Sequence, residues 1–344
     1  MKSNKSQSIA VLGAGSWGTA SAIHLHKNGH RIFLWEHFKE NVALMNKNRK
    51  NPLLPGIAIP EEIEITNDLN YVVEQANIIL TVVPSHAVRE MLEKIDKKLV
   101  HNKLIINLAK GLERKTLKRM SEVISEVLAI SFQNIVTMYG PSHAEEVARE
   151  IPTAVVAASK NMDAARRAQT LFMSDYFRVY TNSDIIGVEI GGSAKNVIAI
   201  ASGICDGLGL GDNTKAALIT RGLMEITRLG VKLGAKEQTF AGLSGVGDLI
   251  VTCGSQHSRN RYLGEEVGKG RKIQEVQDGM TMVAEGVYTA ETVYQLAEKN
   301  QVLMPISNQV YKILYEDKDP RQGLNDLMTR EPVKERHSIP GDKK

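Results

Sequence analysis

Short apolar runs alternate with segments of helical periodicity along the first half of the chain. Residues 8–12 and 31–35 are compact runs of apolar side chains. Between them, residues 19–28 repeat apolar positions with helical spacing, and Gly29 is a typical helix terminator. This pattern predicts a strand, a helix and a second strand within about thirty residues.

The same order recurs further along the chain. Strands are predicted at 78–83, 103–108, 134–138, 153–158 and 177–180, and helices from Pro84 and Ser85 onward, at 113–128 and at 143–149. The run 78–83 has no polar alternation, which is typical of a strand covered on both faces. The repeated order predicts a parallel, doubly wound α/β sheet.

Beyond about residue 182 the pattern becomes helical. Helices are predicted at 185–205, 214–233, 258–269, 287–298 and 305–315. We therefore expect an α/β domain at 1–186, an all-helical domain at 187–330 and a charged, flexible tail at 331–344. A stripe of charged residues follows helical spacing and is expected to face solvent: Arg221, Glu225, Arg228 and Lys232.

Composition supports two globular domains. The chain has 344 residues, of which 42% are hydrophobic, and a net charge of +4 that is too small to predict nucleic-acid binding. Cys205 and Cys253 lack the spacing of a metal site and fit a reducing compartment. Residues 1–8 are polar, unlike a signal peptide, and the apolar stretch 185–204 contains charged residues. We therefore expect a cytoplasmic protein without a membrane span.

A glycine-rich motif follows the first predicted strand and opens the first helix. Its residues are Gly13, Ala14, Gly15, Ser16, Trp17 and Gly18, in the pattern GxGxxG. In dinucleotide-binding folds these glycines allow a tight turn, close approach of a pyrophosphate and helix–strand packing. The helix N-terminus would then bind the phosphates. The alternative is a glycine-rich turn that binds nothing.

Two residues after the second strand bear on the choice of cofactor. Glu36 stands where a carboxylate accepts hydrogen bonds from the adenine ribose and repels a 2′-phosphate, which favours NAD. His37, when protonated, would favour the phosphate of NADP instead, or it is a solvated surface imidazole. Both NAD and NADP therefore stay open.

Polar residues follow two later strands of the predicted sheet. Lys110 comes after the strand at 103–108, and Gly140 and Ser142 come after the strand at 134–138. Ligands of open α/β sheets bind at the carboxyl ends of the strands, so these residues are candidates for substrate binding. The alternative for Lys110 is an ordinary surface lysine.

Lys195 lies in an otherwise apolar helical segment. The only other charged residue from 187 to 203 is Glu189, which lies about 240° away around the helix and cannot pair with it simply. Burial of an amine lowers its pKa and suits it to general acid–base catalysis near pH 7. The alternative is a lysine whose amine reaches the surface.

Two further segments carry candidate polar groups. Asp248 ends a glycine turn that begins at Gly245, where it would hold a lysine or cap a helix. Ser258, Arg259 and Asn260 resemble a helix start with a guanidinium beside free N–H groups, which suits a phosphate. An exposed arginine at a helix start is the alternative.

Taken together, these motifs resemble the bacterial NAD(P)-dependent glycerol-3-phosphate dehydrogenase family. The motifs that carry the resemblance are 13–20, 83–86, 109–112, 140–142, 194–199, 213–222, 245–249, 258–260 and 283–286. The resemblance implies a Rossmann-like sheet domain followed by a helical domain like the C-terminal domain of 6-phosphogluconate dehydrogenase. It implies conversion of dihydroxyacetone phosphate to sn-glycerol 3-phosphate for phospholipid synthesis in the cytoplasm, and a homodimer stays open.

The resemblance also implies residue roles. Lys195 matches the proton donor and acceptor, and Lys110 touches both substrate and cofactor. The implied substrate contacts are Gly140, Ser142, Asp248, Ser258, Arg259 and Asn260. The implied cofactor contacts are Ser16, Trp17, His37, Ala144, Arg259, Val283 and Glu285. Glu36 departs from the small residue common in relatives, which puts the usual tolerance of NADP in doubt.

Two other functions are compatible with the same pattern. A related hydroxyacid dehydrogenase would bind a carboxylate rather than a phosphate, and a dinucleotide sensor would bind cofactor without catalysis. Lys110, Lys195 and Asp248 together favour an enzyme over a sensor.

Overall fold

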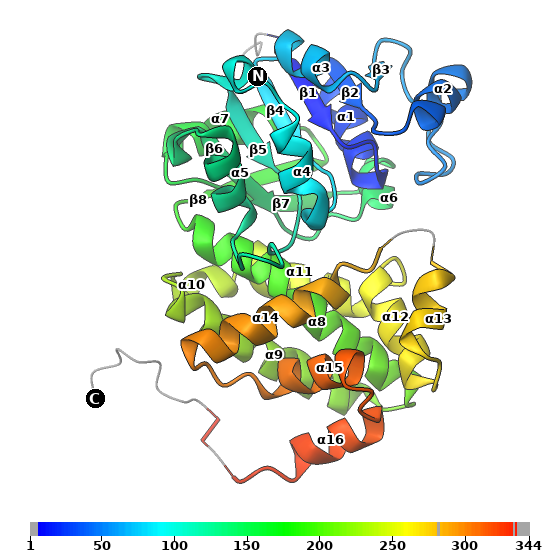
Figure 1. Cartoon of the computed structure of the whole chain (residues 1–344), viewed down its shortest axis with the longest axis vertical. Helices are drawn as coiled ribbons and strands as arrows, with labels where there is room; N and C mark the ends of the chain where they lie inside the picture. Colours follow the sequence, from blue (N-terminus) through cyan, green and yellow to red (C-terminus); the bar gives the residue numbers. More distant parts are fainter. Residues whose placement is uncertain (1–5, 281–282, 333, 336–344) are drawn as a thin grey trace. The chain divides into compact units, whose positions relative to one another are not determined.

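The computed structural model describes residues 6–280, 283–332, 334 and 335. In this described part, eight strands form a sheet in the order β3-β2-β1-β4-β5-β6-β7-β8 (Figure 1). The strands are β1 Ser8–Leu12, β2 Arg31–Trp35, β3 Glu64–Thr66, β4 Ile78–Thr81, β5 Leu104–Asn107, β6 Ile135–Tyr139, β7 Thr153–Ala158 and β8 Phe177–Asn182. The predicted doubly wound sheet is confirmed, and β1 and β4 meet where the winding reverses.

The apolar strands are explained by a hydrophobic core on each face of the sheet. Ile9 and Val11 of β1 belong to one core, and Ala10 and Leu12 belong to the other. Successive side chains of a strand point to opposite faces, so a strand covered on both faces needs no polar positions.

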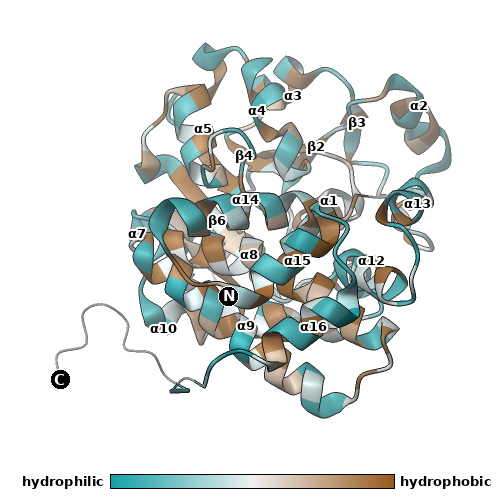
Figure 2. Cartoon of the chain, turned by 60° about the horizontal axis from the view of Figure 1, so that its bottom comes forward, coloured by the Kyte–Doolittle hydropathy of each residue, from teal (hydrophilic) through white to brown (hydrophobic). Residues whose placement is uncertain are grey.

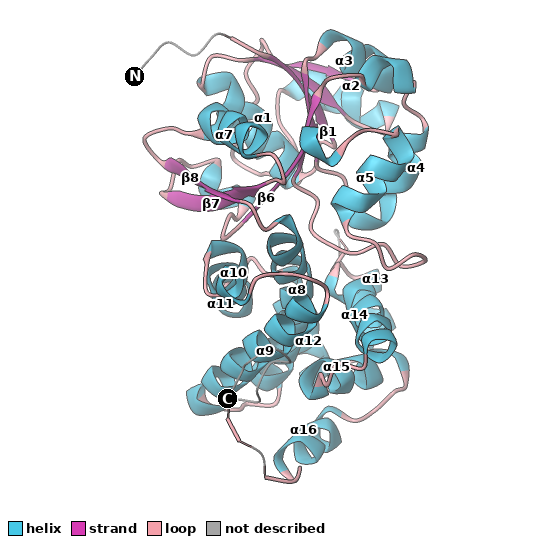
Figure 3. Cartoon of the chain, turned by 90° about the vertical axis from the view of Figure 1, so that its left-hand side faces the viewer, coloured by secondary structure: helices cyan, strands magenta, loops and turns pink. Residues whose placement is uncertain are grey.

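Helices cover both faces of this sheet (Figure 3). They are α1 Ser16–Lys27, α2 Lys39–Asn48, α3 Leu69–Gln75, α4 Val88–Glu93, α5 Met120–Leu128, α6 Ala144–Val147 and α7 Met162–Phe172, with 3₁₀ turns at Ser85–Ala87, Lys97–Val100 and Phe132–Asn134. The helix predicted at 113–128 begins only at Met120. Leu117 has a left-handed φ of 60°, and the carboxylate of Glu122 accepts the N–H of Arg119, which caps the helix there.

The prediction of a parallel sheet is wrong at one pair of strands. β7 runs antiparallel to β6, with Tyr139 opposite Val156. The connection between them contains only the four-residue helix α6. β7 therefore begins at the end of the sheet where β6 finishes, an arrangement that needs no long crossover helix between the two strands.

The later part of the chain is helical, as Figure 3 shows. Its elements are α8 Ile185–Gly207, α9 Asp212–Lys232, α10 Glu237–Phe240, a π-helix at Leu243–Gly247, α11 Asp248–Gly254, α12 Arg259–Gly268, α13 Ile273–Asp278, α14 Gly286–Asn300, α15 Pro305–Tyr315 and α16 Pro320–Met328. The sequence pattern did not predict β3, α2, α3, α7, α10, α11, α13 or α16.

Figure 2 shows hydrophilic and hydrophobic positions alternating on α15, whose Ile306, Val310 and Ile313 are buried.

The burial of α8 and of Glu225 on α9 can be compared with what the sequence predicted for these helices. α8 is long and apolar enough to span a membrane, but 94% of its most apolar stretch is buried inside the protein, as predicted. The charged stripe on α9 is not entirely solvated, because Glu225 is only 1% exposed. Its carboxylate accepts the N–H groups of Ile306 and Ser307 and so caps the start of α15.

Contacts divide the chain into two compact units. The first contains the residues up to Ser193 together with Gln238–Asp248, and the second contains Ala194–Glu237 and the described residues from Leu249 onward. Predictions for the first five residues and for most of the tail at 331–344 lie outside the described residues.

Candidate functional site

The glycine motif forms a tight loop from β1 into α1. Gly13 has φ of 120°, and a Cβ there would lie 2.9 Å from the backbone nitrogen of Val83. A Cβ on Gly18 would lie 1.8 Å from the carbonyl oxygen of Gly13. A Cβ on Gly15 would meet nothing within 4 Å, so the backbone at the start of α1 is open to a ligand. Helix N–H groups without intrahelical partners suit a phosphate at this position.

Asn51, which the sequence analysis missed, supports this loop from outside the motif. It is 4% exposed, and its amide donates to the Ala14 carbonyl oxygen at 2.8 Å and to the Thr19 hydroxyl at 2.6 Å. Nearby, Trp17 packs against a small cluster that contains Leu54 and Ala144. The structure therefore brings together Trp17 and Ala144, two predicted cofactor contacts.

The two residues that bear on cofactor choice follow β2 directly. Glu36 is 9% exposed, and its Oε1 accepts from the N–H of Phe38 at 3.0 Å and from Asn41 at 3.2 Å. These bonds hold the carboxylate in place. The centroid of the His37 ring lies 5.8 Å from the centroid of the Trp35 ring and 4.8 Å from that of the Phe38 ring.

Lys110 and Asp248 form an ion pair in the first unit. Lys110 Nζ lies 2.7 Å from Asp248 Oδ2 and donates to the Gly140 carbonyl oxygen at 3.0 Å. The side chain of Asp248 is 1% exposed, and that of Lys110 is 19% exposed. Ser142 donates to the same carbonyl at 3.0 Å. Hydrogen bonds thus join four candidate residues of this unit, and three of them follow the carboxyl ends of β5 and β6: Lys110, Gly140 and Ser142. The fourth is Asp248.

The predicted glycine turn before Asp248 is a π-helix, and the chain is packed too tightly there for a side chain at Gly245. A Cβ on Gly245 would lie 2.0 Å from the Phe240 carbonyl oxygen. Within the same unit, a Cβ on Gly191 of α8 would lie 2.7 Å from the Ser244 carbonyl oxygen. The glycines thus let α8 and the π-helix approach closely. π-helical turns are frequent at functional sites.

Lys195 is buried in the second unit. It is 4% exposed, and its Nζ lies 2.7 Å from the Thr252 hydroxyl of α11. The amine therefore does not reach the surface in the way the alternative interpretation required. The residue that follows Thr252, Cys253, is also buried, and burial raises the pKa of its thiol to about 12. Sequence reasoning missed Thr252, which carries no motif of its own.

The segment predicted to grip a phosphate starts a helix, as expected. Ser258 caps α12 by accepting the N–H of Arg261 at 3.2 Å. Asn260 is 9% exposed and accepts the N–H of Gly286 at 2.8 Å. Arg259, which is exposed, donates to the Val283 carbonyl oxygen at 3.0 Å.

These contacts connect the start of α12 with the start of α14. A Cβ on Gly286 would lie 2.8 Å from the Asn196 carbonyl oxygen. The residue after Lys195 thus lies against the same junction. Within the second unit, α8, α12 and α14 therefore meet at these candidate residues, and Glu285 directly precedes α14.

Comparisons with known proteins agree over nearly the whole chain. The family described as NAD-dependent glycerol-3-phosphate dehydrogenase matches with its N-terminal part at residues 8–165 and its C-terminal part at 184–325. A glycerol-3-phosphate dehydrogenase (NAD(P)+) of Chlorobium limicola is 51% identical over 331 residues, covering 95% of this chain and 99% of that protein. One of Thermoanaerobacter sp. is 52% identical over 331 residues, covering 96% and 99%.

Solved structures agree as well. The crystal structure of glycerol-3-phosphate dehydrogenase from Coxiella burnetii has a TM-score of 0.90 and 41% sequence identity, and the match covers 94% of this chain and 99% of that one.

Proposed function

The chain belongs to the NAD-dependent glycerol-3-phosphate dehydrogenase family, and we propose that it interconverts dihydroxyacetone phosphate and sn-glycerol 3-phosphate with NAD or NADP. The proposal rests on relatives named glycerol-3-phosphate dehydrogenase (NAD(P)+), which are 51% and 52% identical to this chain and cover 95% and 96% of it. It favours this activity over the hydroxyacid dehydrogenase and the dinucleotide sensor considered from the sequence.

The glycine loop suits a dinucleotide. Gly13 and Gly18 hold the turn closed, and the backbone around Gly15 is free of side chains. We assign the pyrophosphate to the N-terminus of α1, where Ser16 and Trp17 begin the helix. The carboxylate of Glu36 would accept from the adenine ribose, and its charge disfavours a 2′-phosphate. The nicotinamide, when bound, supplies or accepts the hydride.

Two lysines have distinct proposed roles. Lys195 donates a proton to the oxygen of the ketone as it becomes an alcohol, and takes it back in the reverse direction. Thr252 holds the amine of Lys195 in one orientation. Lys110 stabilises the negative charge that develops on the same oxygen, and Asp248 with the Gly140 carbonyl fixes its ammonium group.

The substrate phosphate is assigned to the start of α12. The guanidinium of Arg259 and the amide of Asn260 supply donors there, and the helix N-terminus adds its own N–H groups. Holding the phosphate fixes the position of the ketone. A cytoplasmic location and the supply of glycerol 3-phosphate to phospholipid synthesis complete the proposal.

An assay with Lys195→Ala tests the proposal. The purified chain should oxidise NADH or NADPH with dihydroxyacetone phosphate and not with 3-keto acids. Loss of the proton donor should lower kcat by about 10²- to 10⁴-fold. Dissociation constants for NADH and NADPH, measured by fluorescence, should stay unchanged. Sedimentation of the same preparation distinguishes the monomer from the homodimer.

Lys232→Ala is the control, because Lys232 is an exposed lysine at the end of α9 in the same unit and has none of the proposed roles. It should retain full turnover. Full activity of Lys195→Ala would refute the assignment of Lys195, and inactivity of the unsubstituted chain with both cofactors would refute the function itself.

A further inference from the structure

The backbone that leads into Lys110 lies just past the end of β5. That strand ends at Asn107, and residues 108–110 belong to no helix or strand. Ala109 is nevertheless only 5% exposed. Buried backbone N–H and carbonyl groups need hydrogen-bond partners inside the protein, and beyond the end of a strand these partners have to be side chains.

Asn107 bonds both backbone groups of Ala109. Its Oδ1 accepts the N–H of Ala109 at 3.1 Å, and its Nδ2 donates to the Ala109 carbonyl oxygen at 3.2 Å. The hydroxyl of Thr81 on β4 donates to the same Oδ1 at 3.0 Å. A backbone N–H can only donate, so the oxygen and nitrogen of the Asn107 amide cannot exchange places. The orientation of this fully buried side chain is therefore determined.

Tyr139 bonds the same carbonyl from the neighbouring strand, β6. Its hydroxyl donates to the Ala109 carbonyl oxygen and accepts from Nδ2 of Asn107, the latter at 3.1 Å. Tyr139 is fully buried as well. The Ala109 carbonyl oxygen thus has two donors that also bond to each other, and Asn107 and Tyr139 together form a clamp on Ala109.

The clamp acts on Lys110 through the peptide bond. A peptide group is planar, so the Ala109 carbonyl oxygen lies in one plane with the nitrogen and Cα of Lys110. Two donors on that oxygen therefore restrict the direction in which the Lys110 side chain leaves the backbone. At its other end, Lys110 Nζ donates to the carbonyl oxygen of Gly140, the residue after Tyr139, and lies 5.8 Å from the centroid of the Tyr139 ring.

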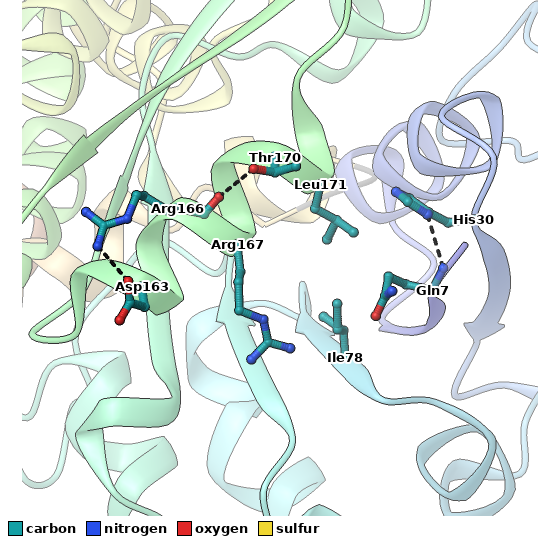
Figure 4. Close-up of a pocket in the computed structure, with 8 residues that line it drawn as sticks. All are labelled: Gln7, His30, Ile78, Asp163, Arg166, Arg167, Thr170 and Leu171. Carbon is teal, nitrogen blue, oxygen red and sulfur yellow. Dashed lines mark hydrogen bonds and ion pairs between the residues drawn. The ribbon is translucent and has the colours of Figure 1, made fainter. Parts of the chain in front are cut away.

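The clamp lies at the edge of the sheet that suits a ligand. Asn107 and Tyr139 are the last residues of β5 and β6, and open α/β sheets bind ligands at the carboxyl ends of their strands. The hollow shown in Figure 4 lies at the opposite ends, where Gln7 precedes β1 and Ile78 begins β4. The described residues that line this hollow have none of the proposed roles.

We propose that Asn107 and Tyr139 are positioning residues for the reduction of the ketone, a role that rests on the proposed function. They act through Lys110. By holding the Ala109 carbonyl, they keep the Lys110 ammonium group where it stabilises the negative charge that develops on the substrate oxygen. The competing explanation is that the clamp only satisfies a buried backbone group, which would stabilise the fold without affecting the chemical step.

Tyr139→Phe removes the hydroxyl and keeps the ring, and Asn107→Ala removes the other half of the clamp. We expect kcat for dihydroxyacetone phosphate to fall about tenfold in the first variant and about a hundredfold in the second. The value of kcat/KM should fall equally, since Lys110 stabilises charge that exists only in the transition state. A double-mutant cycle with Lys110→Gln separates the two explanations. In that background, either substitution should lower kcat little further.

Tyr71→Phe is the control, because its hydroxyl bonds the carboxylate of Glu64 at the amino end of β3. It should keep the turnover of its parent in both backgrounds. Urea unfolding identifies the folded variants, and Tyr139→Phe alone suffices for the cycle if Asn107→Ala does not fold.

Two results would overturn the positioning role and leave the proposed function intact. One is an equal loss of kcat with and without Lys110. The other is an unchanged kcat in folded Tyr139→Phe. A lack of turnover in the unsubstituted chain would differ from both, because it would refute the proposed function and the positioning role with it.

Discussion

At the scale of single residues, Asn51 decides how the glycine loop is held. The loop motif explains its own sharp turn, but the Thr19 hydroxyl donates to the Ala14 carbonyl oxygen only at a long 3.4 Å, so both groups gain from a further partner inside the protein. The Asn51 amide satisfies both, and its own oxygen accepts the N–H of Leu53 at 2.9 Å. Removal of such a buried partner leaves polar groups unsatisfied, which is costly.

Asn51→Ala should therefore loosen the loop without touching the reacting groups. We expect the dissociation constant for the dinucleotide to rise about tenfold, the equivalent of about one lost hydrogen bond. The value of kcat at saturating cofactor should change little. Asn48→Ala, at an exposed position of α2, is the control. Unchanged cofactor affinity in Asn51→Ala would show that the loop holds its shape alone.

At the scale of elements, α8 depends on glycine to pack closely. A Cβ on Gly192 would lie 2.5 Å from Cδ2 of Tyr139. That ring is fully buried, and its hydroxyl donates to the Ala109 carbonyl oxygen, next to Lys110. Alanine is a better helix former than glycine, but a contact this short against an immobile ring outweighs the gain.

Gly192→Ala should therefore destabilise the protein by about 1–3 kcal/mol, measured by urea unfolding. Activity should fall too, since Tyr139 borders Lys110. Ser193→Ala is the neighbouring control: within the described residues its buried hydroxyl has no hydrogen-bond partner, so its removal should be neutral or stabilising. Equal stability of the two variants would show that close packing of α8 on Tyr139 does not contribute to the free energy of unfolding.

At the scale of the whole molecule, buried imidazoles couple stability to pH. Burial lowers the pKa of His24, opposed by a smaller effect of its hydrogen bond to the Phe172 carbonyl oxygen. His30 shifts in the same direction. The unfolded chain thus binds protons more readily than the folded one as pH falls below about 6.5. Each group then reduces stability by at most about 1.4 kcal/mol per pH unit.

The urea midpoint should consequently be lower at about pH 5.5 than at about pH 7.5. His24→Gln should reduce this difference, because it removes one titrating group. His101→Gln, at an exposed position, is the control and should keep the difference of the unsubstituted protein. A midpoint that stays constant or rises as the pH falls through this window would contradict the coupling between histidine burial and stability.

The sequence by itself determined the features that depend on neighbouring residues. The glycine motif, the apolar strands covered on both faces and the burial of α8 all follow from local spacing. Ser258 was also predictable as a helix start, since a cap acts on residues within one turn.

Only the tertiary structure decided which distant groups meet. Lys110 pairs with Asp248, 138 positions away, and Lys195 with Thr252, 57 positions away. Glu225 was assigned to solvent because its own helix looks charged, but the start of α15 buries it. The reversed direction of β7 likewise depends on a short connection and on strand pairing. Such contacts form between segments remote in sequence, so no local pattern of residues encodes them.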